Sequence, residues 1–563
     1  MPTITVIKED LDRLAGQVYS LSELETALEV AKAEVKEEDD GHLRIQLKDT
    51  NRPDLWSSEG LARLLKGYRE GHHPTYDFFE ENGKTAREIR VDPALKDIRP
   101  YIAAFTCEGI QVDGAALEQL IEAQEKLCDN YGRGRSAVAI GIYDASDIIY
   151  PVRYDAVDPD ATRFVPLEFD VEMDLRQILR DHPTGRTYAH LLEGFGRFPL
   201  LRDSRGEVLS MPPIINSQTL GRVEVGDACL FCEATGTEID AILLSMAVMA
   251  VNMADRGGKI HPVVVRYPYD THRGRNVRCP ADITEHLVAK FDHIREVIGG
   301  NLPAEKILAA LNAMGYREIA LQEKAVRARP APYRDDILHP VDLIEDVVIA
   351  IGYDNFEPEM PHDFTVGKAA PAEDLSDRFR ELMVGCGFQE IFLSILSSRE
   401  DLTSRMRTPD APIVEIANPM SEYYSAARGS LLPGLLRVEG ASRRAIYPHR
   451  IFEVGEVAVI APEENYGTRT DIRLAALDAS SEANLSGIQS FLEAVAYHLG
   501  FEYTLKPVDH PTFLPGRAGE ICMNDKTYGL IGEVHPEVLD AWGITVPVSA
   551  FEVNIHIARE SEH

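Results

Sequence analysis

Runs of apolar residues with two different periods divide the chain into predicted strands and helices. Alternation of apolar and polar positions predicts strands at residues 3–7 and 43–47. After Asn51, apolar residues at helical spacing (Leu61, Leu64 and Leu65) predict a helix. Further helices are expected at 239–254, 302–314, 374–386 and 485–499, and further strands at 103–112, 228–234 and 389–393.

The order of these elements predicts an α+β protein of several domains. With 563 residues the chain exceeds what one hydrophobic core can serve. The segment 354–372 carries three prolines among acidic residues and is expected to be a linker. The expected domains are an N-terminal α+β unit at 1–90, a β-rich unit with long helices at 91–265, a compact module at 266–353, and a larger α/β unit at 373–563.

Composition and charge narrow the class of protein. Hydrophobic residues make up 44% and charged residues 27% of the chain, which is typical of a soluble globular protein. No apolar run reaches the roughly 18 residues that a membrane span needs, and the first ten residues do not resemble a signal peptide. We therefore expect a cytoplasmic protein that does not contact a membrane. The net charge of −34 would repel nucleic acid from most of the surface, so we do not expect independent DNA or RNA binding.

The cysteines give no sign of a disulfide framework or a zinc site. Seven cysteines are scattered along the chain, and Cys229 and Cys232 form its single C-x-x-C pattern. No second pair of ligands at zinc-binding spacing accompanies them. We expect all seven to be reduced thiols.

An acidic segment at 335–346 precedes an apolar helical run and is the strongest candidate for a metal site. Asp342, Glu345 and Asp346 stand at positions i, i+3 and i+4, which share one face of a helix. Like charges at this spacing repel, and oxygen ligands grouped in this way suit a hard cation such as Mg²⁺. The alternative is that these acids occupy the first turn of a helix, where the helix dipole favours negative charge.

Several motifs in order along the chain resemble the β subunit of phenylalanyl-tRNA synthetases, of the archaeal and eukaryotic cytosolic type. No segment resembles the tRNA-binding OB domain or the anticodon-binding domain of the longer bacterial type. The motifs are Asn51-Arg52-Pro53-Asp54-Leu55, Arg99-Pro100-Tyr101, residues 211–217, Thr235-Gly236-Thr237, Met314-Gly315-Tyr316 and Ile351-Gly352-Tyr353.

The resemblance implies a fold and an assembly. Residues 91–265 would form the B3/B4 editing domain, 266–353 the B5 domain, and 373–563 a core like that of class II synthetases, built on an antiparallel sheet. The chain would join an α subunit in an α2β2 heterotetramer that binds tRNA(Phe), and the α subunit would use ATP. By this resemblance, the acids that bind a metal in the family correspond to Asp336, Asp342, Glu345 and Asp346, which would hold Mg²⁺ shared with the α subunit.

The C-terminal core is expected to be catalytically silent. Class II catalysis needs one arginine in an F-R-x-E pattern and another in G-x-G-x-G-x-x-R. The nearest residues here are Arg450, with Glu453 three positions later, and Arg517 within a broken glycine pattern. Without both arginines nothing obvious stabilises the charge that develops on the transferred phosphoryl group. Arg428 and Arg517 are interpreted as ion-pair residues that stabilise the fold.

By the same resemblance, the residues of the family's editing pocket correspond to Leu201, Ser210, Glu233 and Thr235. Glu233 would accept a hydrogen bond from the hydroxyl of a misattached tyrosine, Ser210 and Thr235 would position the ester or the attacking water, and Leu201 would shape the wall. Archaeal relatives commonly have aspartate where this chain has Glu233. The alternatives are that Ser210 and Thr235 cap loops and that Glu233 is a solvated strand residue.

Three functions remain open at this stage. The first is a β subunit of phenylalanine-tRNA ligase that supports attachment of phenylalanine to its tRNA and hydrolyses mischarged Tyr-tRNA. The second is a free-standing hydrolase of mischarged tRNA. The third is a scaffold subunit without editing.

Overall fold

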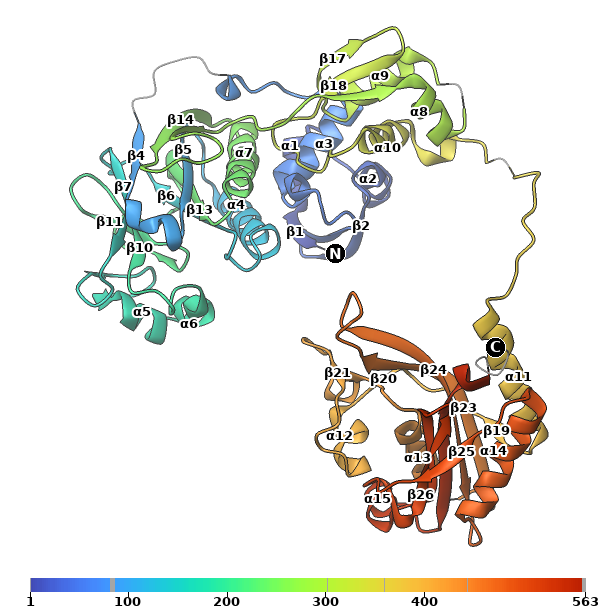
Figure 1. The fold of residues 1–563 in the computed structure, drawn as a ribbon. Coiled ribbons are helices and arrows are strands. Elements are labelled where there is room, and N and C mark those ends of the chain that lie inside the picture. Colours follow the sequence, from blue (N-terminus) through green and yellow to red (C-terminus); the bar gives the residue numbers. More distant parts are fainter. Residues whose placement is uncertain (1, 81–86, 301, 359, 443, 559–563) are drawn as a thin grey trace. The chain divides into compact units, whose positions relative to one another are not determined.

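The chain folds into two compact units, residues 1–359 and 360–563 (Figure 1). The structure is a computed structural model that describes residues 2–80, 87–300, 302–358, 360–442 and 444–558. The division falls inside the segment 354–372, in which the described residues 356–370 form no helix or strand. The multidomain α+β class expected from the sequence is confirmed.

The first unit begins with a three-stranded antiparallel sheet in the order β1-β3-β2. Alternate residues of β3, namely Leu43, Ile45 and Leu47, are buried, as the period of two predicts. The elements of this part are β1 (Thr3–Ile7), α1 (Lys8–Ala15), α2 (Leu21–Leu28), β2 (Ala33–Asp39), β3 (His42–Leu47) and α3 (Ser58–Glu70).

A ten-stranded sheet dominates the first unit, with the path β12-β11-β10-β7-β4-β14-β5-β13-β6 and with β15 paired to β14. Strand pairing therefore extends beyond the boundary expected at residue 265. The strands are β4 (Glu88–Val91), β5 (Tyr101–Glu108), β6 (Val138–Asp144), β7 (Val152–Val157), β10 (Phe198–Arg202), β11 (Val208–Met211), β12 (Ile215–Asn216), β13 (Cys229–Gly236), β14 (Lys259–Arg266) and β15 (Asn276–Cys279).

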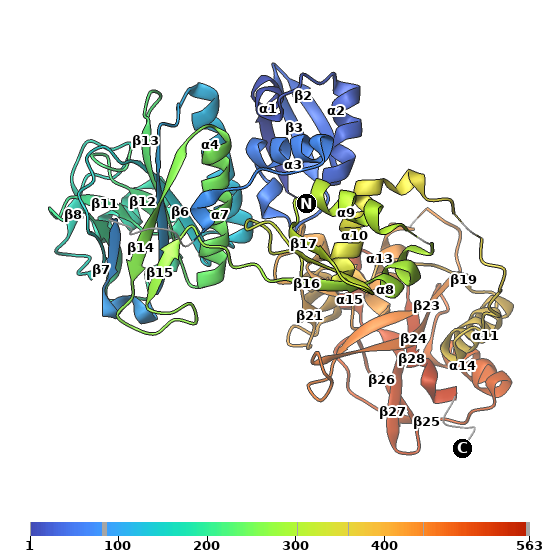
Figure 2. The same ribbon diagram turned by 90° about the horizontal axis from the view of Figure 1, so that it is seen from above.

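Helices pack along this sheet. Helix α7 (Ile239–Asp255) is apolar on almost all sides and lies against β5 and β13, with α4 (Gly114–Lys126) nearby in both views (Figures 1 and 2). A helix that is apolar all round is a buried helix. Residues of α7 and of the sheet belong to one hydrophobic core, which also includes residues of β1, β3, α3 and of the last part of the unit.

The last part of the first unit is a small sheet in the order β16-β18-β17 with three helices. The helix predicted at 302–314 is confirmed as α9, and Gly315 follows it with φ of +82°, a left-handed conformation that glycine adopts without strain. The elements are β16 (Leu287–Lys290), α8 (Phe291–Ile298), α9 (Ala304–Ala313), β17 (Arg317–Leu321), β18 (Ala325–Arg329) and α10 (Pro340–Ile351).

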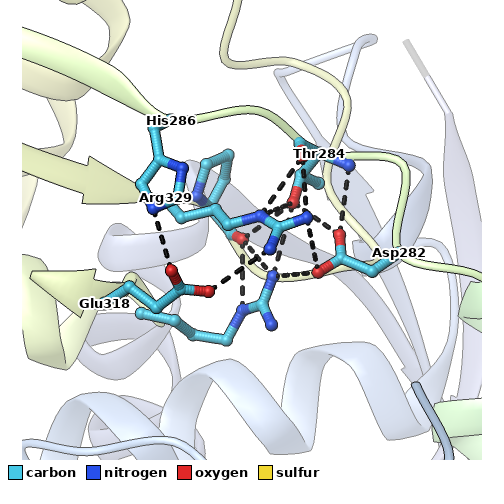
Figure 3. Close-up of polar contacts among 7 residues, drawn as sticks. Asp282, Thr284, His286, Glu318 and Arg329 are labelled. Carbon is cyan, nitrogen blue, oxygen red and sulfur yellow. Dashed lines mark hydrogen bonds and ion pairs between the residues drawn. The ribbon is translucent and has the colours of Figure 1, made fainter. Parts of the chain in front are cut away.

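One carboxylate ties this sheet to the segment that leads into it (Figure 3). Asp282 lies 2.7 Å from the guanidinium of Arg317 and 3.0 Å from that of Arg329, and it accepts a 2.6 Å hydrogen bond from Thr284. Its side chain is 11% exposed. Burial alone would raise the pKa of Asp282, but the hydrogen bonds from Thr284 and Arg317 outweigh burial and lower it.

We expect Asp282→Asn to lower the free energy of unfolding of the first unit by about 1–3 kcal/mol, because two arginines lose their shared charge partner. The folded pKa of Asp282 is depressed, so its contribution is present above the pKa of an unfolded aspartate and is lost as the pH falls below it. The difference between parent and variant should therefore shrink in acid. Chemical unfolding at several pH values measures this.

Fluorescence can report on each unit separately, because Trp56 lies in the first unit and Trp542 in the second. A Trp542→Phe background restricts the signal to the first unit. Asp292→Asn is the control, because Asp292 is 89% exposed and its pair with Arg295 is a surface pair. Equal destabilisation by both variants would contradict the role given to Asp282.

The second unit is a seven-stranded sheet in the order β19-β23-β24-β28-β27-β26-β25, antiparallel except for the β19–β23 pair. In β28, Phe551 and Val553 join one hydrophobic core and Val548 and Ala550 join the other, as alternation along a strand requires. The strands are β19 (Gln389–Glu390), β23 (His449–Ile460), β24 (Thr468–Ala479), β25 (Thr504–Pro507), β26 (Phe513–Met523), β27 (Lys526–Val534) and β28 (Val548–Asn554).

Helices cover both faces of the second sheet. Helices α11 and α14 share a core with one face, and α13 and α15 share a core with the other (Figure 1). The prediction of a helix at 485–499 is confirmed, whereas the strand expected at 389–393 is shorter. The helices are α11 (Pro371–Gly385), α13 (Leu432–Ala441), α14 (Leu485–Leu499) and α15 (Pro536–Trp542).

Two expectations about the whole chain are also tested. No helix in the described ranges is long and apolar enough to cross a membrane. All seven cysteines are free thiols, as predicted.

Candidate functional site

Three of the four predicted pocket residues line one cavity of about 170 Å³ in the first unit. Ser210 lies on β11, and Glu233 and Thr235 lie on β13. Leu201 lies on β10 directly opposite Ser210 in the strand register and is fully buried, but it does not line the cavity. Leu201 therefore packs behind the wall of the cavity.

The cavity exists because the two ends of the ten-stranded sheet meet. Strands β11 and β12 lie at one end of the path and β6 at the other. Tyr143 of β6 nevertheless lies 2.8 Å from Ser210 of β11, and the side-chain amide of Asn216 on β12 donates to the carbonyl oxygen of Ile142 on β6 at 3.3 Å. The sheet thus curls on itself and encloses the residues between its ends.

Glu233 is a buried acid with one bound and one unbound oxygen. The Tyr143 hydroxyl lies 2.8 Å from Oε1, while Oε2 is buried and has no hydrogen-bond partner among the described residues. Burial raises the pKa of Glu233 to about 8, against the opposing effects of the Tyr143 hydrogen bond and the charge of Arg99. The residue is 2% exposed, so the alternative of a solvated strand acid is wrong.

Thr235 is held by a buried arginine. The Nε of Arg99 donates to the Thr235 hydroxyl at 2.9 Å, and the guanidinium also donates to the Thr235 carbonyl oxygen at 2.6 Å. Burial lowers the pKa of Arg99. Thr235 and Ser210 both lie in strands, so the alternative that they cap loops is wrong.

Sequence reasoning missed three residues of this site. Tyr143 bridges Ser210 and Glu233, and Arg135 lines the cavity with its Nε buried and without a partner among the described residues. At Gly141, a Cβ would lie 2.2 Å from the Tyr143 hydroxyl oxygen and 2.7 Å from Glu233 Oε1. A glycine inside a buried strand was the available signal, since it marks a close approach of other atoms.

The four acids proposed as metal ligands each contact other groups of the chain. Asp342 accepts backbone hydrogen bonds from Leu338 at 2.8 Å and His339 at 2.7 Å, so it stabilises the start of α10. Glu345 is half exposed and lies 2.6 Å from Lys32. Both contacts are those expected of acids on a helix surface and in a helix first turn.

Asp336 and Asp346 share a buried arginine. The guanidinium of Arg334 lies 2.5 Å from Asp336 and 2.7 Å from Asp346, and the Tyr316 hydroxyl donates to Asp346 at 2.9 Å. Arg52 of the N-terminal motif lies 3.8 Å from Asp336. Two buried arginines therefore offset the repulsion within the acidic segment.

These contacts leave no ready cage for a cation in this chain. Across the described ranges, no three His, Cys, Asp or Glu side chains are grouped so that they could hold a metal ion. The guanidinium of Arg334 lies within 2.7 Å of both buried acids and supplies the positive charge that pairs with them. The residues as arranged do not fit Mg²⁺, and metal binding by Asp336, Asp342, Glu345 and Asp346 stays a prediction.

Arginines of the second unit form internal ion pairs. Arg428 is buried and lies 2.8 Å from Glu453, as its interpretation as an ion-pair residue predicted. Arg473 lies 2.8 Å from Glu552. Arg517 is largely exposed and 3.9 Å from Glu533, a pair that contributes little.

The chain is similar to known proteins over its whole length. A family profile described as the phenylalanyl tRNA synthetase beta chain CLM domain matches residues 357–555, and the tRNA synthetase B5 domain matches residues 287–353. A phenylalanine–tRNA ligase beta subunit of Borrelia recurrentis is 38% identical over 561 residues, which cover 99% of each chain. That of Pyrococcus horikoshii is 40% identical over 560 residues, which cover 98% of this chain and 99% of the relative.

A solved structure agrees with these sequence matches. A crystallised N-terminal fragment of the phenylalanyl-tRNA synthetase beta subunit from Pyrococcus horikoshii superimposes with a TM-score of 0.59 at 38% identity. The match covers 62% of this chain and all of the fragment.

Proposed function

The chain belongs to the family of phenylalanine–tRNA ligase beta subunits, and from this premise we propose that its cavity hydrolyses Tyr-tRNA that the ligase has mischarged. As a member of this family the chain is a subunit of an aminoacyl-tRNA synthetase and acts in protein biosynthesis. The proposal assigns to the subunit a second reaction, which corrects the product of the first.

The observation that carries the proposal is the unbound oxygen of Glu233. Glu233 lines the cavity, and its Oε2 is buried without a hydrogen-bond partner among the described residues. A buried polar atom without a partner costs free energy, and a ligand that donated a hydrogen bond to it would remove this cost. The volume of about 170 Å³ is below the roughly 300 Å³ of a drug-sized site, so the cavity suits an amino-acid side chain. A phenol that reaches Glu233 would supply the missing hydrogen bond.

The chemistry explains why a separate site is needed. Tyrosine differs from phenylalanine by one hydroxyl, and an apolar pocket rejects an added hydroxyl only weakly. A site built around a polar group rejects an analogue that lacks the hydroxyl, because the buried polar group of the site then has no hydrogen-bond partner. In this proposal Glu233 binds the phenol, Ser210 and Thr235 position the ester or the attacking water, and Leu201 supports the wall.

We propose that the α subunit carries the ATP-dependent attachment of phenylalanine. The arginines Arg428 and Arg473 of the second unit are already paired with Glu453 and Glu552, which supports a core without ATP chemistry of its own. The proposed assembly is an α2β2 heterotetramer in the cytoplasm that binds tRNA(Phe). Mg²⁺ is assigned no step in this chain, because Arg334 pairs with Asp336 and Asp346, and the other two acids make contacts of their own.

An exposed apolar surface on the second unit is the proposed docking site for the α subunit. Phe392, Leu396, Met420 and Tyr423 are 38–104% exposed and flank the small sheet β20-β22-β21. This sheet consists of β20 (Leu396–Ser397), β21 (Val414–Glu415) and β22 (Ala426–Ala427). Exposed apolar and aromatic side chains that gather in this way are typical of protein interfaces.

We expect Phe392→Asp to weaken binding of the α subunit by about 10-fold or more, since a charge would be buried in an apolar interface. Tyr497→Asp is the control, because Tyr497 is 83% exposed on α14, on the other side of the unit (Figure 1). Analytical ultracentrifugation of mixtures measures the affinity. Equal weakening by both variants, or by neither, would place the interface elsewhere.

The proposed function is tested with the separated components. The α subunit, this chain and the complex are each assayed for attachment of phenylalanine and for hydrolysis of Tyr-tRNA, and the complex is sized. The proposal expects a heterotetramer that performs both reactions. Hydrolysis by the isolated chain that does not change on adding the α subunit would favour a free-standing hydrolase, and absence of hydrolysis from every component would favour a scaffold.

A further inference from the structure

A single tyrosine hydroxyl connects two of the proposed pocket residues. Tyr143 is fully buried, and its hydroxyl oxygen lies 2.8 Å from Ser210 Oγ and 2.8 Å from Glu233 Oε1. A phenol has one hydrogen to donate and can also accept. The contacts therefore form a chain in which Ser210 can donate to Tyr143 while Tyr143 donates to Glu233.

This chain fixes the orientation of the Glu233 carboxyl group. Oε1 is bound by Tyr143, whereas Oε2 has no partner in the described part of the structure. Without the Tyr143 hydrogen bond, no hydrogen bond among the described residues would hold the carboxyl group in one orientation. The backbone leaves room for this contact only because Gly141, opposite Glu233 in the strand register, has no Cβ.

We propose that Tyr143 is a positioning residue that sets the selectivity of the cavity for a phenol by holding the Glu233 carboxyl group with Oε2 toward the ligand. The proposal rests on the editing reaction proposed above. The proposed ligand is an aromatic amino acid esterified to tRNA, and the cavity recognises its phenolic hydroxyl.

Tyr143→Phe tests this role with little change in packing. The ring of Tyr143 lies 5.7 Å from that of Phe231, and phenylalanine keeps this contact while losing the bridging oxygen. For the αβ complex, we expect kcat/KM for hydrolysis of Tyr-tRNA to fall about 10- to 100-fold, as for the loss of one hydrogen bond to an acid. The slow hydrolysis of Phe-tRNA should not change, so the Tyr/Phe ratio falls by the same factor.

Tyr150 provides a matched control, because its ring packs on the same phenylalanine as that of Tyr143. Tyr150 also packs on Phe231, at 6.3 Å, but its buried hydroxyl has no hydrogen-bond partner among the residues described. Tyr150 does not line the cavity. Tyr150→Phe removes the same atom from the same cluster and should leave both hydrolysis rates unchanged.

The pH profile gives a readout that a purely structural role would not change. The Tyr143 hydrogen bond lowers the pKa of Glu233 relative to burial alone, so its removal should raise that pKa further. The pH at which Tyr-tRNA hydrolysis depends on Glu233 should therefore move upward in Tyr143→Phe. It should stay in place in Tyr150→Phe.

A second variant keeps the test decisive if Tyr143→Phe does not fold. Gly141→Ala places a Cβ against the Tyr143 hydroxyl and Glu233 Oε1, so it should also lower the Tyr/Phe ratio by about 10-fold or more. Equal loss of both hydrolysis rates, or no loss, in either folded variant would overturn the role of Tyr143. Failure of the unmodified complex to hydrolyse Tyr-tRNA would instead overturn the proposed function itself.

Discussion

Glu233→Ala in the αβ complex should reduce hydrolysis of Tyr-tRNA by about 100-fold and leave attachment of phenylalanine nearly unchanged. The variant removes the buried oxygen that the phenol would reach, and sites that hydrogen-bond a substrate hydroxyl derive large discrimination from such a group. Attachment is proposed to take place on the α subunit, so it should not respond to this variant. The measurements are single-turnover deacylation of Tyr-tRNA and steady-state charging with phenylalanine.

The control for this variant is Glu108→Ala on the neighbouring strand. Glu108 is the last residue of β5, pairs with Arg87, and is 43% exposed. Glu108→Ala therefore applies the same substitution to an exposed glutamate of the same sheet. Mischarged Tyr-tRNA should accumulate with Glu233→Ala and not with Glu108→Ala. If charging and hydrolysis fell together in Glu233→Ala, the residue would serve the fold and not the editing reaction.

Arg334→Met should lower the free energy of unfolding of the first unit by about 3–5 kcal/mol. The substitution leaves Asp336 and Asp346 buried without the guanidinium that pairs with both, and an uncompensated buried charge costs several kcal/mol. Arg334→Lys should be intermediate, because an ammonium group cannot reproduce the paired contacts of a guanidinium. Urea unfolding followed through Trp56 in the Trp542→Phe background measures these effects.

Arg90→Met is the matched control, because Arg90 is 64% exposed and its pair with Glu88 lies on the surface. It should change stability by less than about 1 kcal/mol. A stability of Arg334→Met close to that of the unmodified chain would show that another cation compensates the acids. The assignment of Arg334 as their partner would then be withdrawn.

The sequence predicted local structure well wherever the hydrophobic periodicity and the capping residues indicated the same element. The helix at 485–499 has the same ends in the structure, because an apolar stripe is bounded by Asn484 as N-cap and Gly500 in the left-handed conformation. The strand expected at 389–393 was shorter, since the register with β23 includes Gln389 and Glu390 and the next residue adds one hydrogen bond, from Ile391 N–H to Phe452. Pairing between strands is a long-range property that the local pattern does not contain.

The site shows the same division. The resemblance to the family predicted Ser210, Glu233 and Thr235 as pocket residues, and all three line one cavity. Tyr143, which contacts Ser210, was missed. Tyr143 reaches Ser210 only because the sheet curls until its ends meet, and no local pattern encodes that curl. The buried Arg334 beside the acidic segment was missed as a partner, because arginine is mostly exposed and the local pattern does not show that this one is buried.

The ratio of single-turnover hydrolysis rates of Tyr-tRNA and Phe-tRNA on the unmodified αβ complex tests whether the cavity edits mischarged tRNA. We expect rapid loss of tyrosine and a rate for phenylalanine at least about 100-fold slower, because phenylalanine leaves Glu233 Oε2 without a hydrogen bond. Equal rates for the two esters, or a tyrosine rate no faster than hydrolysis without enzyme, would contradict this proposal.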